Sequence, residues 1–198
     1  MLSAIEHFRD NIARVRGLGG IHQALTSMIT SAVDTSDILR AQYVLAVSAL
    51  DHYVHEVTRL GMLETFDGKR PPSAAYLRFR LPISCLATGQ SVSRSDVESE
   101  IRSQHSYVAF QKPDRIADGI RLISEVKLWD SVSERMNTPP EMIKQRLLLI
   151  VDRRNKIAHE ADLDPTYPKA RWPISDADVA GVIDFLVEVV ETIHLEVQ

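Results

Sequence analysis

The part of the chain best suited to chemistry is the stretch LLLIVDRRNKIAHEADLD, residues 147–164. Its aliphatic run leads directly into Arg154, which keeps helical spacing with apolar residues on both sides. A guanidinium within an apolar stripe needs a carboxylate, a phosphate or a wet subunit interface, because burying it unpaired is costly. His159 follows Asn155 by four positions and shares its helix face. The pattern alone fits a buried ion pair, a charged helix end or a site.

The elements that position these residues are predicted to be helices, since the apolar residues recur at helical spacing and period-two alternation is missing. Thr35 or Ser36 can cap the long helix, and Ser175 with Asp178 forms a capping-box pattern before the last one. A turn is predicted at Gly17, Gly19 and Gly20, and Pro113 is expected to open one of the later helices. Helices are predicted over 3–16, 21–29, 37–62, 95–110, 113–126 and 128–136, from Pro139–Pro140 through the motif, and from Ser175 onward. An all-α bundle is therefore expected.

Composition limits the class of protein. The chain has 198 residues, of which 44% are hydrophobic, which suffices for the core of a single domain spanning 1–198. A net charge of -4 argues against broad coating of nucleic acid, although a local basic groove remains compatible with it. Cys85 stands alone, so no intrachain disulfide forms. Neither an apolar leader nor a membrane-length apolar run is present, which predicts a cytoplasmic protein.

Residues 64–95 are predicted to be an irregular insertion with at most one short helix, since they hold three prolines and several Gly and Ser. No acidic residue lies between Asp67 and Asp96, so the basic side chains there have no local counter-charge. Tyr76 and Phe79 are interleaved with them, a mixture that suits single-stranded RNA. A solvated charged loop is the alternative. The basic residues are Lys69, Arg70, Arg78, Arg80 and Arg94.

The sequence resembles a known family at these same residues. RNKIAH fits the Arg-x4-6-His signature of HEPN domains, with Asn directly after Arg. The wider RRNKIAHE, together with ALDHYVHEV and QKPDRIADGIRLISEVKLWDSV, is similar to the RiboL-PSP branch of that family. The resemblance covers most of the chain.

This resemblance implies a helical homodimer with two copies of the motif facing each other, and a metal-independent endoribonuclease acting as a toxin or defence effector. Arg154 would hold the scissile phosphate, His159 would move a proton, and Asn155 would contact the phosphate or orient the histidine. Arg153 points about 100° away from Arg154. Arg153 and Lys156 are therefore expected to contact the RNA backbone instead.

An earlier helix is expected to support the site. Family members often carry an acidic residue there, and Asp51 matches it, with His55 one turn further along. Asp51 is expected to pair with Arg154, either for catalysis or only to hold the bundle together. His52, His55 and Glu56 fit no zinc motif, so no metal or cofactor is expected. Likewise, the glycines at 17–20 lack the strand and Lys-Ser/Thr of a phosphate loop.

Two other functions remain open. The chain can be a non-catalytic HEPN module that binds nucleotide or RNA, or that acts as partner of a nucleotidyltransferase antitoxin. It can also be the HEPN part of a longer defence system whose sensing component lies in another protein.

Overall fold

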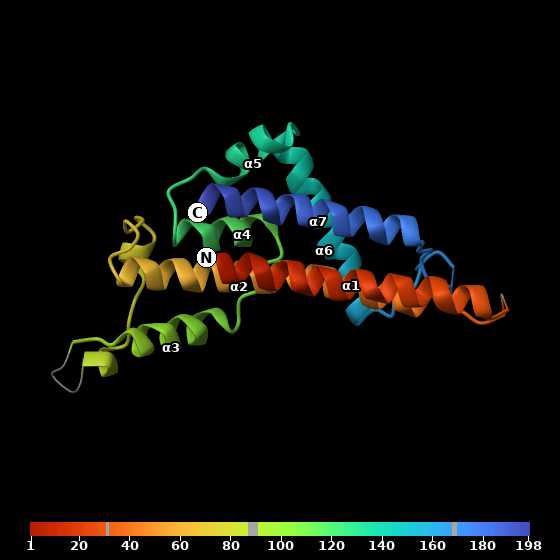
Figure 1. Ribbon diagram of the computed structural model, residues 1–198, viewed down its shortest axis with the longest axis horizontal. Coiled ribbons are helices and arrows are strands. Elements are labelled where there is room, and N and C mark those ends of the chain that lie inside the picture. The colour runs from red at the N-terminus through yellow and green to blue at the C-terminus, as the bar shows by residue number, and fades with distance from the viewer. Residues whose placement is uncertain (31, 87–90, 168–169) are drawn as a thin grey trace.

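The structure is a computed structural model that describes residues 1–30, 32–86, 91–167 and 170–198. Within these ranges it is all-α, as predicted, with seven α-helices, two short 3-10 helices and no strand (Figure 1). The α-helices are α1 (Leu2–Met28), α2 (Ser36–Phe66), α3 (Arg94–His105), α4 (Pro113–Arg121), α5 (Leu128–Met136), α6 (Pro140–His159) and α7 (Asp176–Val197); the 3-10 helices are η1 (Tyr76–Arg78) and η2 (Ile83–Leu86). No helix among the described residues is both long and apolar enough to cross a membrane.

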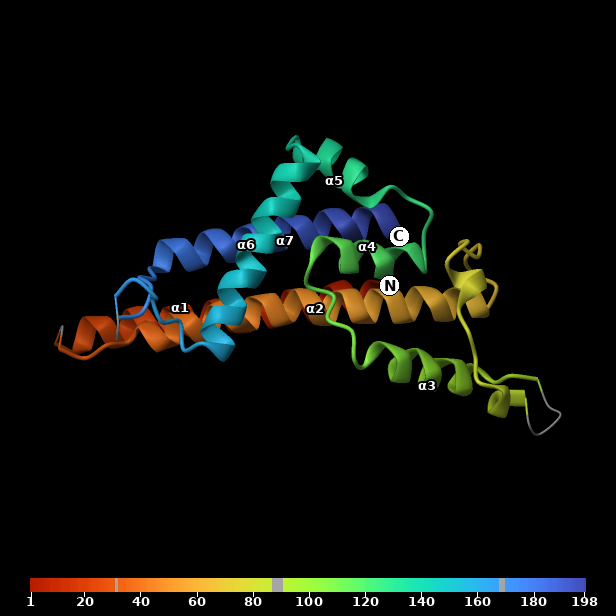
Figure 2. The ribbon, with the colours of Figure 1, turned by 180° about the vertical axis from the view of Figure 1, so that it is seen from behind.

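Three long helices form the body of the molecule. α1 and α2 run antiparallel along each other, and α7 packs beside both (Figure 1). α6 crosses this layer steeply and reaches α2 with its C-terminal end, which Figure 2 shows from behind. α5 packs on α7 and α6, while α3 and α4 pack on α2. The motif-bearing helix is thus held by α2, the helix that carries Asp51.

A single apolar core joins all seven α-helices. The predicted stripe of α7 faces this core, with Leu186, Val189 and Ile193 fully buried. Tyr53 of α2 is fully buried at its centre, where its hydroxyl lies 3.2 Å from Nδ1 of His194. Burying a tyrosine is inexpensive only when its hydroxyl has a partner, and His194 supplies one.

The predicted turn at the first glycines is wrong, because α1 continues through them to Met28. Gly19 packs against α2, where an added Cβ would be 2.8 Å from Nε2 of Gln42. That amide donates to the Val15 carbonyl at 2.9 Å. The glycine therefore permits close helix packing instead of ending the helix.

Helix ends follow the capping predictions in part. Ser175 and Asp178 form the predicted capping box, and Pro113 opens α4. Thr35 occupies the N-cap position of α2 but makes no side-chain capping bond. The helices predicted over 95–110 and 113–126 end earlier, at His105 and Arg121, because residues 106–112 and 122–127 form connections.

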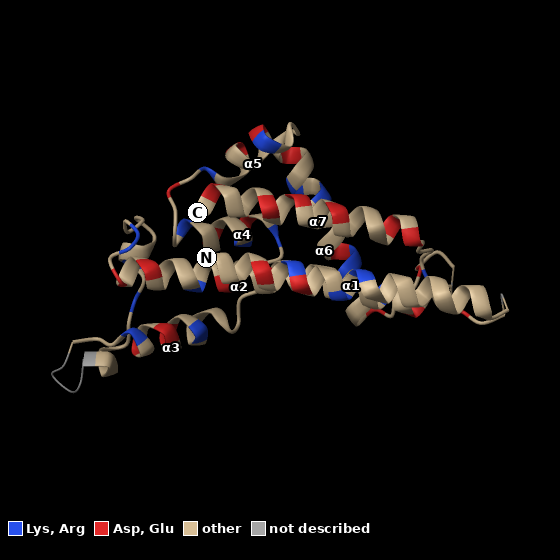
Figure 3. Ribbon diagram, viewed as in Figure 1, with Lys and Arg blue, Asp and Glu red and all other residues tan. Residues whose placement is uncertain are grey.

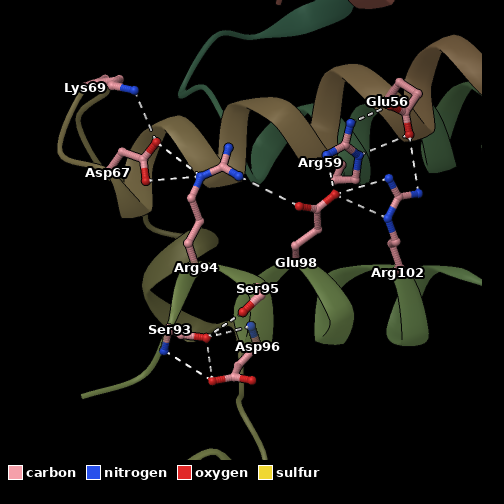
Figure 4. A network of polar contacts seen from close by, with 10 residues as sticks. All are labelled: Glu56, Arg59, Asp67, Lys69, Ser93, Arg94, Ser95, Asp96, Glu98 and Arg102. Carbon is pink, nitrogen blue, oxygen red and sulfur yellow. Dashed lines mark hydrogen bonds and ion pairs between the residues drawn. The ribbon is translucent and has the colours of Figure 1, made fainter. Parts of the chain in front are cut away.

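The described residues between α2 and α3 (67–86 and 91–93) are irregular, as predicted, apart from η1 and η2, where at most one short helix was expected. Three basic residues of the predicted insertion have acidic partners. Lys69 and Arg94 both contact Asp67, and Arg70 contacts Glu64 at 3.3 Å. Figure 4 shows how Arg94 joins a network of ion pairs between α2 and α3. Counter-charge comes from helices that precede and follow the segment, so the expectation of locally unopposed charge is wrong for these three residues.

Candidate functional site

The motif occupies the last two turns of α6. Apolar residues of the preceding turns anchor the helix, since Ile143, Leu147, Ile150 and Val151 are buried in the core. Asn155 is half-buried and His159, the last residue of α6, is exposed. The motif therefore lies at the surface of the molecule, at the end of a helix whose preceding turns are buried in the core.

Arg154 has an unsatisfied charge. It is half-buried, and its Nη1 donates to Oδ1 of Asn155 at 3.1 Å. Its Nε is buried without a hydrogen-bond partner among the described residues. The four other arginines that are buried or half-buried all contact a carboxylate; they are Arg40, Arg59, Arg70 and Arg153. Since leaving a desolvated cation unpaired is costly, Arg154 is suited to receive an anion.

A cleft of about 400 Å³ opens beside Arg154. One wall is α6, and the other is the connection between α3 and α4 together with the first turn of α4. His159 is not among the lining residues, although it lies one helical turn beyond Asn155. The cleft is lined by Tyr107, Val108, Ala109, Gln111, Lys112, Arg115, Val151, Arg154 and Asn155, with three basic residues and no acidic one.

Asp51 does not form the expected ion pair with Arg154 among the described contacts. One carboxylate oxygen accepts from the backbone N–H of Phe110 at 2.6 Å, and the other accepts from Nε2 of Gln111 at 3.2 Å. Its position on α2 directs it at the 106–112 connection instead of at α6. Asp51 therefore holds the opposite wall of the cleft, through hydrogen bonds that its charge strengthens.

His55 supports the same wall. Its Nε2 lies 3.0 Å from the Val108 carbonyl and 3.8 Å from a carboxylate oxygen of Asp51, one turn earlier on α2. Its ring packs edge-on against Phe110, which also contacts the ring of His105. Burial lowers the pKa of His105, and the nearby His55 lowers it further. This aromatic cluster joins α2, α3 and the connection that follows α3.

Arg153 is engaged in a clamp that sequence reasoning missed. Its Nη2 donates to Oδ2 of Asp162 at 2.8 Å, and Nε of Arg40 donates to the same oxygen at 2.8 Å. Asp162 is fully buried and has a positive φ of 59°, and both arginines also donate to the Trp172 carbonyl. The clamp joins the C-terminal end of α6 to the start of α2. The only sequence signal was the group of acidic residues after His159.

The remaining predicted RNA contacts lie outside the cleft lining. Lys156 contacts Asp152 at 2.9 Å, one turn earlier on α6. Arg70 is half-buried and donates to the Ile123 and Val197 carbonyls besides its contact with Glu64, a role in holding the fold together. Lys69, Arg78 and Arg80 are exposed on the segment after α2.

Metal-binding geometry is missing from the described part of the chain, where no group of three or more His, Cys, Asp or Glu side chains is placed to hold an ion. His52 is exposed, and His55 is committed to the Val108 carbonyl. The chemistry that this site offers is thus that of a cation, an amide and a histidine on one helix end.

Comparison with known proteins extends over nearly the whole chain. The family described as RiboL-PSP-HEPN matches residues 9–198, a range that includes every residue of the candidate site. No curated protein and no solved structure matches the chain.

Proposed function

The chain belongs to the RiboL-PSP-HEPN family, and from this premise we propose that it is a metal-independent endoribonuclease. The observation that carries the proposal is Arg154, the half-buried arginine of the described residues whose charge has no carboxylate partner. It lines a cleft without acidic residues, next to Asn155 and one to two turns before His159. A phosphodiester supplies the missing anion, and ribonucleases are common in HEPN families.

Cleavage would proceed by attack of the ribose 2′-oxygen on the adjacent phosphorus. The P–O bond to the 2′-oxygen forms, and the P–O bond to the 5′-oxygen of the next nucleotide breaks. One proton leaves the 2′-OH and one is added to the departing 5′-oxygen; His159 makes one of these two transfers, and water makes the other. Arg154 stabilises the charge added in the pentacoordinate state, and Asn155 holds Arg154 through its side-chain oxygen. A 2′,3′-cyclic phosphate and a free 5′-hydroxyl result.

The active form would be a homodimer in the proposed mechanism. One chain leaves His159 exposed and outside the cleft that Arg154 lines. A second copy packed against the same end of α6 would enclose His159 and place two motifs around one strand of RNA. A toxin or defence role follows from this activity, because uncontrolled cleavage of RNA stops growth.

The test is incubation of the purified wild-type chain with RNA in the presence of EDTA. We expect cleavage products that end in a 2′,3′-cyclic phosphate. His159→Ala and Arg154→Ala should each lower the rate by about 10²–10⁴-fold, the range for an acid–base or oxyanion group. His7→Ala, exposed on α1, is the matched control and should cleave like the wild type.

RNA that stays intact with a folded, dimeric wild type would refute the enzymatic proposal. The alternative is a binding module that partners an antitoxin, and it is tested by measuring the growth of cells that express the chain. If expression of the wild type and of His159→Ala slows growth equally, the chain acts through binding. Toxicity lost only in the variant supports catalysis.

A further inference from the structure

The wall of the cleft opposite α6 carries two cations for which the sequence predicted no role in binding. Lys112 is exposed just before α4, and among the described residues it makes no ion pair. Arg115, in the first turn of α4, has Asp118 as its nearest carboxylate, at 3.7 Å, and both side chains are at least half exposed. An exposed pair at that distance contributes little, so both cations are available to a ligand.

This wall is held in place by hydrogen bonds to its backbone. Asp51 accepts from the Phe110 N–H, and Nε1 of the buried Trp129 donates to the Pro113 carbonyl at 3.1 Å. The backbone on either side of Lys112 is thus fixed to α2 and α5. Because this backbone is already ordered, only the two side chains lose freedom when they bind a ligand, which favours a site over a solvated loop.

Tyr107 stands at the same cleft with its side chain almost free of protein contact. It is 95% exposed, the largest exposure of any large apolar or aromatic side chain described here. A tyrosine ring left in water beside cations is suited to stack on a nucleobase.

We propose that this cleft is a second nucleotide subsite, next to the scissile phosphate held by Arg154. Lys112 and Arg115 bind the neighbouring phosphate of a single RNA strand, and Tyr107 stacks on the base attached to it. The assignment rests on the proposed function for its ligand, RNA. The subsite goes beyond the proposed function, because it adds three residues outside the HEPN motif, and these residues determine RNA binding instead of bond cleavage.

The size and charge of the cleft favour this ligand. Its volume of about 400 Å³ lies in the range of small-molecule sites, roughly 300–1,000 Å³, and is too small for an RNA duplex. Basic residues occur on both walls, so phosphates can be held from two sides. α7, by contrast, carries acidic residues and no Lys or Arg (Figure 3).

The test measures binding without cleavage. In a His159→Ala background, the affinity for a short, fluorescently labelled single strand of A and U is followed by anisotropy at several salt concentrations. Lys112→Gln/Arg115→Gln should weaken binding roughly tenfold and flatten the slope of log K against log salt by about 0.7, the value for one phosphate that is no longer neutralised. Tyr107→Ala should weaken binding about tenfold, whereas Tyr107→Phe should not.

Arg121→Gln/Lys127→Gln is the matched control, since it also removes one arginine and one lysine, from the last residue of α4 and from the connection that follows it. The subsite would be overturned if the Lys112/Arg115 variant kept the RNA affinity and the salt slope of its parent. It would also be overturned if the control variant lost as much affinity. The two proposals fail separately. Cleavage by the wild type with unchanged binding refutes the subsite alone, and weakened binding with no cleavage by the wild type refutes the nuclease alone.

Discussion

Arg153 and Arg154 are neighbours on α6, yet the helical rotation of about 100° between them gives them different surroundings. Arg153 turns to the buried carboxylate of Asp162, and Arg154 turns to the cleft. The sequence favoured Arg154 as the phosphate ligand because Asn155 follows it. It could not reveal the partner of Arg153, because Asp162 accepts from Arg153 only after the chain has turned back beyond His159 with two residues at positive φ.

The clamp around Asp162 leads to a stability prediction. Asp162→Asn removes the charge that faces both Arg40 and Arg153, and leaves two arginines without their buried partner. Breaking a buried ion pair from one side costs about 3–5 kcal/mol, so the free energy of unfolding measured in urea should fall by about that amount. Because the clamp positions the end of α6, RNA cleavage should fall as well.

Asp37→Asn is the control for this substitution. Asp37 contacts Arg171, but both side chains are exposed, and an exposed pair contributes about 0–1 kcal/mol. A loss for Asp162→Asn no larger than for Asp37→Asn would mean that the buried clamp does not stabilise the fold.

At the scale of elements, the glycines of α1 show where a sequence pattern is ambiguous. Three glycines in four positions favour a turn, because glycine stabilises a helix less than other residues do. The structure keeps the helix because close approach to α2 at Gly19 outweighs that weak local preference. Periodicity predicted the other helices well, since it reports which face is buried. It could not predict a contact between two helices.

Alanine substitution at these glycines tests the continuous helix. A Cβ at Gly17 would meet nothing within 4 Å, so Gly17→Ala should raise the free energy of unfolding by about 0.5–1 kcal/mol through helix propensity. Gly19→Ala would force Gln42 to move and should lower it by about 1 kcal/mol or more. Urea denaturation measures both; a destabilising Gly17→Ala would indicate a break in α1.

The contact between α2 and α3 should make stability depend on pH. Burial lowers the pKa of His105 below its usual 6.5, so the unfolded chain binds a proton there more readily than the folded chain. The stabilisation is fully present above about pH 6.5 and is lost as the pH falls through the folded pKa. The charged and titratable groups around it are His52, His55, Glu56, Arg59 and Arg102.

We therefore expect the free energy of unfolding to decline between about pH 7.5 and pH 5.5, and less steeply in His105→Gln than in the wild type. His7→Gln, exposed on α1, serves as the comparison and should keep the wild-type slope. His194, whose pKa burial also lowers, accounts for decline that remains in His105→Gln. Identical slopes in all three proteins would exclude His105 as the source.

At the scale of the whole molecule, the cleft explains what the sequence could and could not predict about the site. α6 and its motif were predictable, because the motif residues are close in sequence. The opposite wall was not, since Lys112 and Arg115 reach the cleft only through the packing of α4 on α2 and α6. The net charge of -4 is also misleading on its own, because acidic residues concentrate on elements such as α7 and are missing from the cleft lining.

The assembly of two chains gives the last prediction. Leu149, 63% exposed, and its neighbour Leu148, 46% exposed, present apolar side chains on the surface of α6, and we expect the second copy of the proposed dimer to cover Leu149. Leu149→Lys should therefore yield a folded monomer by light scattering and abolish RNA cleavage, because charge in an apolar interface opposes association. Leu195→Lys makes the same change at an equally apolar residue of α7, 56% exposed, and should leave both dimer and cleavage intact. If Leu149→Lys is monomeric yet cleaves RNA at the wild-type rate, one copy of the motif is sufficient for cleavage. His159 would then have to reach the cleft of its own chain.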